Sequence, residues 1–83
     1  MLVFTVRDAK AEAYMSPFYM KTRGEALRAF MDTVGNPDHL FSKHPEDYSL
    51  YALGAFDDSN GTFSLLQEPE FMGSAVDLVK PTA

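Results

Sequence analysis

The sequence contains no cysteine among its 83 residues. Disulfide bonds and thiolate metal sites are therefore excluded as sources of stability. No apolar segment approaches the roughly 20 residues that a membrane-spanning helix needs. The apolar start, residues 1–6, ends at once in Arg7 and Asp8, so it does not form the core of a signal peptide. We expect a soluble intracellular protein whose stability depends on apolar packing.

Cations are scarce in the second half of the chain. Residues 45–83 hold one basic residue and seven acidic ones, whereas residues 1–44 hold six basic and five acidic ones. The net charge of −5 therefore divides into +1 for the first part and −6 for the second. The mean field of such a molecule repels phosphate, but a local basic face on the first half is compatible with this balance.

The apolar content is enough for one folded domain. Hydrophobic residues make up 46% of the chain and aromatic residues 13%, which is too apolar for a disordered segment. We find no internal repeat, low-complexity tract or long linker. The length permits one compact domain, which we expect to span residues 1–83.

The first half predicts a strand and a helix. Residues 2–6 have the β-branched and aromatic composition of a central strand. Residues 8–21 are expected to form an irregular connection. Thr22 and Glu25 fit a capping box, and apolar residues recur at helical spacing up to Val34. We therefore expect a helix over about residues 23–34, ended by Gly35 in the left-handed conformation.

The second half predicts a long hairpin. Residues 48–56 and 62–66 are rich in strand-forming side chains, and residues 57–61 form the turn between them. Gly54, inside the first arm, predicts a bulge or a close backbone approach. Over residues 70–79 the apolar spacing favours a short helix, with Pro69 at its start. Alternate residues from 72 to 78 would also suit a strand.

These elements predict an α+β fold. We expect a small antiparallel or mixed sheet of about three strands, with one main helix packed on it and a short C-terminal helix. Such a sheet leaves edges and part of one face uncovered. A homodimer or higher homo-oligomer is therefore expected.

The sequence offers little for catalysis. It has no cysteine nucleophile and no glycine-rich phosphate loop. His39 and His44 flank a loop and are expected to be solvated rather than metal-bound. Asp57 and Asp58 do not fit a calcium loop, because its first ligand position would fall on Phe56. We expect no enzyme activity, no cofactor and no metal site.

A basic and aromatic stretch in the first half suggests contact with nucleic acid. Tyr14 and Tyr19 lie in the same connection as lysine and arginine residues, a mixture that suits base stacking with phosphate contacts. Phe18, in the same stretch, is expected to pack in the core instead. The candidate interface comprises Arg7, Lys10, Tyr14, Tyr19, Lys21, Arg23, Arg28, Lys43 and His44.

Several short segments together resemble a known family. They are residues 8–14, 17–18 and 24–32, residues 43–48, Gly54, the turn with Gly61, and Pro69 followed by Gly73 and Ala75. In order and spacing the chain resembles the small nonstructural protein of gokushoviruses, tailless single-stranded DNA phages of the microvirus group. The resemblance implies a DNA-binding protein in the host bacterial cytoplasm that acts in the switch from duplex replication to single-strand synthesis and packaging.

Two segments of the sequence have alternative interpretations. The acidic second half, with Asp57 and Asp58 at the hairpin end, would suit an adaptor that recruits or inhibits a replication protein. For residues 43–47, a rigid turn that leads into the hairpin is favoured over the alternative, a role in binding a partner.

Overall fold

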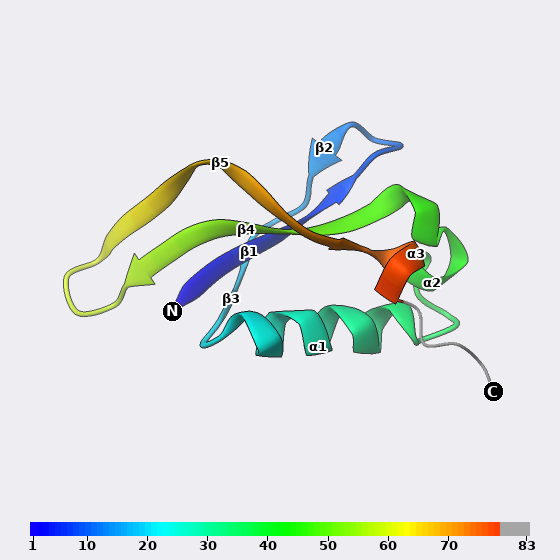
Figure 1. Cartoon of the computed structure of the whole chain (residues 1–83), viewed down its shortest axis with the longest axis horizontal. Coiled ribbons are helices and arrows are strands. Elements are labelled where there is room, and N and C mark those ends of the chain that lie inside the picture. Colours follow the sequence, from blue (N-terminus) through cyan, green and yellow to red (C-terminus); the bar gives the residue numbers. More distant parts are fainter. Residues whose placement is uncertain (79–83) are drawn as a thin grey trace.

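The computed structural model describes residues 1–78 and shows an α+β fold with one curled antiparallel sheet (Figure 1). The sheet order is β2-β1-β4-β5, and β3 pairs with the same edge of β1 as β2 does. The strands are β1 (Leu2–Asp8), β2 (Ala13–Tyr14), β3 (Phe18–Met20), β4 (Tyr48–Asp57) and β5 (Thr62–Ser74). The helices are α1 (Arg23–Val34), α2 (Leu40–Lys43) and α3 (Ala75–Leu78), with a 3-10 turn at Pro45–Asp47.

Strand β1 is the centre of the fold, as its composition predicts. It pairs with β4 on one side and with β2 and β3 on the other. Between those two short strands the chain stays attached to β1. The Met15 N–H donates to the Val6 carbonyl over 2.8 Å, and the Thr5 hydroxyl donates to the Met15 carbonyl. Residues 8–21, expected to be irregular, are therefore an interrupted strand broken near Pro17, which has no N–H to donate.

Helix α1 occupies the residues that the capping signal predicts. The Thr22 side chain accepts a hydrogen bond from the Glu25 N–H over 3.1 Å, and Ala26, Phe30 and Val34 are buried. The predicted left-handed end is wrong: Gly35 has φ −74° and continues the right-handed turn, with its N–H donated to the Met31 carbonyl.

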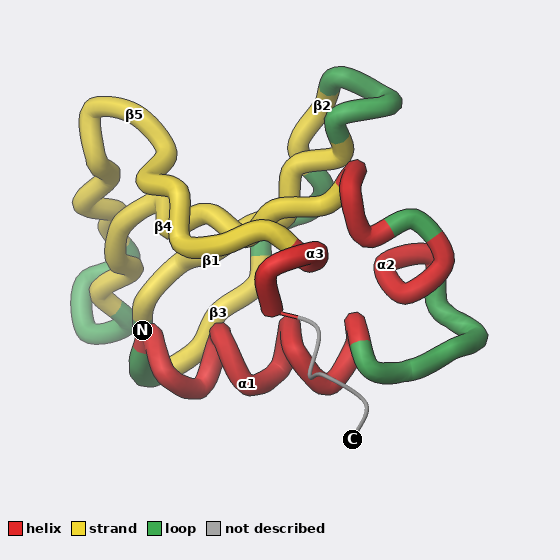
Figure 2. The backbone as a smooth tube through the Cα atoms, turned by 45° about the vertical axis from the view of Figure 1, so that its right-hand side comes forward, coloured by secondary structure: helices red, strands yellow, loops and turns green. Residues whose placement is uncertain are grey.

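The core lies between α1 and one face of the sheet. Phe4 and Val6 of β1 and Leu50 of β4 point into it, and Phe41 and Ala75 from the two short helices complete the same cluster. Figures 1 and 2 show α1 running along this face, with α2 and α3 near its C-terminal end. We call the opposite side of the sheet the outer face; no helix within residues 1–78 packs on it.

The β4–β5 hairpin forms where the sequence predicts, and Gly54 marks its irregularity. Gly54 has φ +146°, and a Cβ atom there would collide with the Ser64 carbonyl. The register passes from Ala52↔Glu70 to Gly54↔Leu65. Residues 66–69 of β5 therefore bow out opposite the single residue Leu53. This bulge accommodates Pro69 inside a strand.

The expectation of a helix over residues 70–79 is wrong for most of its length. Strand β5 continues to Ser74, and only Ala75–Leu78 is helical; residue 79 lies outside the described residues. Pairing of Phe71 with Tyr51 and of Gly73 with Leu50 stabilises the strand instead. The sheet has five strands rather than about three.

Candidate nucleic-acid interface

A row of aromatic rings crosses the outer face from β2 to β5. The guanidinium carbon of Arg7 lies 5.8 Å from the ring centre of Tyr14. The Tyr14 ring meets Tyr51 edge-on with centroids 5.5 Å apart, and Tyr51 meets Phe71 in the same manner at 5.7 Å. Strand alternation explains the row. Arg7 and Tyr51 follow residues whose side chains enter the core, so they point to the opposite side.

A second aromatic group lies towards the tip of the hairpin. Tyr19 contacts Phe56 with ring centroids 6.1 Å apart, and Phe56 contacts Phe63 at 4.9 Å. Tyr19 is opposite Val3 in the β1–β3 register, and its neighbours Phe18 and Met20 pack against the core. Tyr19 therefore also belongs to the outer face, and Phe18 has the core position predicted for it.

These rings are well placed for stacking because much of their surface is open. Tyr14 is 47% exposed and Phe71 is 56% exposed, while the Tyr51 ring between them is half-buried and fixes the arrangement. Aromatic side chains of this kind, supported by neighbouring strands, can stack with the bases of a single strand without reading their sequence. The Arg7 guanidinium adds one positive charge at the β2 end of the row.

The structure divides the nine candidate residues among several places. Arg7, Tyr14 and Tyr19 lie together on the outer face. Arg28 lies on the exposed side of α1, and Lys43 is exposed at the end of α2. Lys21 is exposed between β3 and α1. The predicted residues are therefore not a single basic patch.

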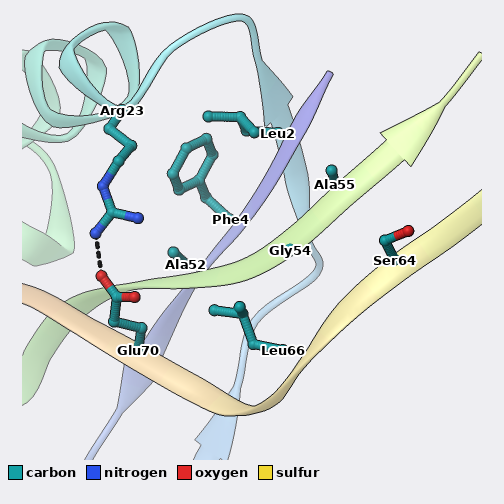
Figure 3. A pocket seen from close by; sticks show the side chains of 9 residues that line it. All are labelled: Leu2, Phe4, Arg23, Ala52, Gly54, Ala55, Ser64, Leu66 and Glu70. Carbon is teal, nitrogen blue, oxygen red and sulfur yellow. Dashed lines mark hydrogen bonds and ion pairs between the residues drawn. The ribbon is translucent and has the colours of Figure 1, made fainter.

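The Arg23 side chain forms an ion pair with a carboxylate. It pairs with Glu70 of β5, in the one ion pair found within residues 1–78. The pair closes one end of a hollow of about 260 Å³ between α1 and β5, on the core side of the sheet (Figure 3). The hollow has apolar walls, including Leu2, Phe4 and Leu66. The charge of Arg23 is offset by Glu70, so we do not count it as a phosphate contact.

His44 lies among acidic groups. The ligand atoms of His44, Glu46 and Asp47 lie within 4.8 Å of one another, and these residues share a hollow with Lys10. One imidazole and two carboxylates are the groups that could hold a divalent cation in this loop. The same carboxylates would repel phosphate, so this loop is a poor continuation of the aromatic face. His39, expected to be solvated, instead caps α2 by accepting a hydrogen bond from the Phe41 N–H.

Two pKa shifts report local environments away from the aromatic row. Burial raises the pKa of the Tyr48 phenol, and the carboxylates of Asp8 and Asp47 raise it further. The hydrogen bonds that Ser59 donates to the Asp57 carboxylate lower the pKa of that group. Asp57 therefore has the structural role in the hairpin turn that the sequence predicts.

Sequence reasoning missed four rings of the outer face: Tyr51, Phe56, Phe63 and Phe71. The alternation within residues 48–56 contained the signal for Tyr51, since Leu50 and Ala52 on either side enter the core. Phe71 was hidden by the helical spacing of the segment around it. The position of Phe56 depends on the bulge at Gly54, which shifts the register of the hairpin.

The arrangement defines a class of protein: a small α+β domain with one helix-covered face and one face, without a described helix, that carries partly exposed aromatic rings. Comparison with protein families identifies it further, because the family model described as Phage ORF5 protein matches residues 1–78. The chain belongs to this phage protein family. No curated protein and no solved structure matches it. None of the helices within residues 1–78 has the length and apolar character to cross a membrane.

Proposed function

We propose that this phage protein binds single-stranded DNA on the outer face of its sheet, without enzymatic activity and in the bacterial cytoplasm. The observation that carries the proposal is the continuous row of Arg7, Tyr14, Tyr51 and Phe71 on a face that no described helix covers. Base stacking suits this chain better than phosphate neutralisation, because its net charge is −5. The gokushovirus resemblance supports a role in the switch to single-strand synthesis and packaging.

A titration of fluorescently labelled oligo-dT at low salt tests the proposal. Tyr14→Ala is expected to weaken binding about 5- to 150-fold, the loss of roughly 1–3 kcal/mol for one stacked base. Leu40→Ala is the matched control, since Leu40 is 58% exposed but lies on α2, away from the outer face. Absence of binding at low salt, or equal affinity for both variants and the wild type, would refute the proposal.

The acidic hairpin end favours one alternative, a protein–protein adaptor. Asp57 and Asp58 are exposed at one end of a molecule that is 45 Å long. Charge reversal at both positions would abolish capture of a replication protein from infected cells if the adaptor role is correct. Under the DNA-binding proposal, the same reversal leaves oligo-dT affinity undiminished, because the turn does not belong to the aromatic row.

A further inference from the structure

Strand β5 ends the sheet with a free edge. Within residues 1–78 its only strand partner is β4, so its other side has no ladder. The segment 62–66 is exposed throughout, with Phe63 at 53%, Leu65 at 65% and Leu66 at 44%. An unpaired edge with apolar side chains is a template for another strand.

The hydrogen bonds of β4 show which peptide groups of β5 face this edge. The Phe56 N–H donates to the Met1 carbonyl over 2.7 Å, and the Phe56 carbonyl accepts from the Met1 amino group over 3.1 Å. Phe56 therefore faces β1, and because direction alternates along a strand, Ala55 faces β5. Its register partner Ser64 faces β4.

It follows that the residues on both sides of Ser64 direct their N–H and C=O groups outward. Phe63 and Leu65 each offer one donor and one acceptor to the free edge. Paired antiparallel about a two-fold axis at Ser64, two such edges satisfy each other, since Phe63 of one chain meets Leu65 of the other.

We propose that the free edge of β5 binds a second copy of this chain, with Ser64 on the two-fold axis. This register pairs Phe63 with Leu65 of the second copy on the outer face, and Thr62 with Leu66 on the core side. Each of these cross-strand side-chain pairs adds to the stabilisation that the backbone hydrogen bonds provide. The resulting interface is isologous, because both copies use the same five residues.

The uncharged and self-complementary segment favours a second copy of this chain over nucleic acid. Residues 62–67 carry no charge, whereas Asp57, Asp58, Glu68 and Glu70 lie on either side of them. An acidic surrounding repels nucleic acid, and the edge presents no cation to a phosphate. Moving the axis to Leu65 would place Phe63 opposite Gln67, inside the bulge, whereas the register centred on Ser64 reaches only the first bulge residue, Leu66.

Pairing about an axis perpendicular to the sheet keeps both outer faces on the same side. The Tyr19–Phe56–Phe63 groups of the two copies then lie next to each other, and the two aromatic faces form one surface. The interface itself is independent of DNA binding.

A cysteine on the axis tests the register directly, because the wild-type chain has none. Opposed residues in a non-hydrogen-bonded antiparallel pair have Cα atoms about 4.5 Å apart, which permits a disulfide. Ser64→Cys is expected to form a disulfide-linked dimer at least about tenfold faster than the control Ser59→Cys, as effective concentration dictates. Ser59 is also exposed but lies in the hairpin turn. Equal rates for the two variants would overturn the proposal.

Mass measurement by sedimentation equilibrium provides the second test. The wild type is expected to dimerise with rising concentration, Leu65→Glu to remain monomeric, and the control Leu40→Glu to dimerise like the wild type. A wild type that stays monomeric at the highest soluble concentration overturns the interface. Should that monomer still bind oligo-dT, the proposed function stands; a dimer without affinity for oligo-dT refutes the function and leaves the interface intact.

Discussion

Gly54 has a backbone conformation that other residues rarely adopt. Its φ is +146°, and a Cβ atom would lie against the Ser64 carbonyl and 2.8 Å from the Leu65 Cα. Both neighbours are backbone atoms of β5, so they cannot move aside without breaking the ladder. Gly54→Ala is therefore expected to lower the free energy of unfolding by about 3 kcal/mol or more, measured by urea denaturation.

Gly61 provides the control for this substitution. It also has a positive φ, +74°, but no atom lies within 4 Å of its would-be Cβ. Gly61→Ala is expected to cost only about 1–2 kcal/mol, the penalty of the left-handed conformation alone. Similar losses for the two variants would contradict the close approach of the strands at Gly54.

Tyr48 makes the stability of the protein sensitive to alkaline pH. Burial and the nearby carboxylates of Asp8 and Asp47 raise the pKa of its phenol in the folded state. The unfolded chain ionises first, near pH 10. The contribution of this group is therefore complete below about pH 10 and is lost as pH rises through the folded pKa.

Tyr48→Phe retains the ring but cannot ionise, so its free energy of unfolding should fall less steeply above about pH 10 than that of the wild type. Denaturant titrations at several pH values measure the difference. Tyr14→Phe, which removes an exposed phenol on the other side of the sheet, is the matched control substitution. Parallel curves for Tyr48→Phe and the wild type would show that the phenol ionises equally in both states.

Helix α1 depends on the residue before it. The Thr22 hydroxyl accepts the Glu25 N–H, one of the backbone donors that have no partner inside the helix. Thr22→Ala should destabilise the protein by about 1 kcal/mol, and Thr22→Ser should restore most of the loss. Thermal unfolding would show a decrease in Tm of roughly 4–8 °C for the alanine variant. An unchanged Tm would show that the cap is not needed.

At the level of elements, local sequence signals correctly predicted those helices and strands that local interactions stabilise. The cap and the apolar spacing of α1 are encoded within residues 22–34, and the helix forms there, although its end at Gly35 is right-handed rather than left-handed as predicted. The C-terminal segment differs because its apolar spacing suits a helix while its partner is far away in sequence. Phe71 pairs with Tyr51, and this long-range ladder outweighs local periodicity. The same reason hid β2 and β3, whose few hydrogen bonds all go to β1.

The candidate site was predicted in part. Tyr14 and Tyr19 were predicted to be aromatic residues that contact solvent, and the structure places both on the outer face with Arg7. The remaining cations were expected to lie on the same surface, because composition alone does not show which way a side chain points. The fold instead turns Arg28 to the exposed side of α1 and pairs Arg23 with Glu70. Which side a charged residue faces depends on register and packing, which composition does not specify.

For the whole molecule, the placement of cations predicts weak salt dependence. Arg7 is the one cation in the aromatic row, and the exposed Lys10 and Lys21 lie at the ends of neighbouring strands. With two or three phosphates contacted, the logarithm of the association constant should fall with the logarithm of salt concentration at a slope of about −1.4 to −2.1. Titrations of oligo-dT at several salt concentrations give this slope. A value near −5 would indicate a basic surface other than the outer face.

The two edges of the sheet are not equivalent, and this limits how far association can proceed. On the β1 side, β2 and β3 are two and three residues long and are separated at Pro17, so they offer no continuous template. Within residues 1–78, only β5 presents a regular edge, and its bulge with Pro69 ends that edge after a few residues. When two molecules pair there, each has used the only regular free edge within its residues 1–78. Fibril growth needs two regular edges per subunit. The separation of β2 and β3 at Pro17 and the β5 bulge with Pro69 therefore block it.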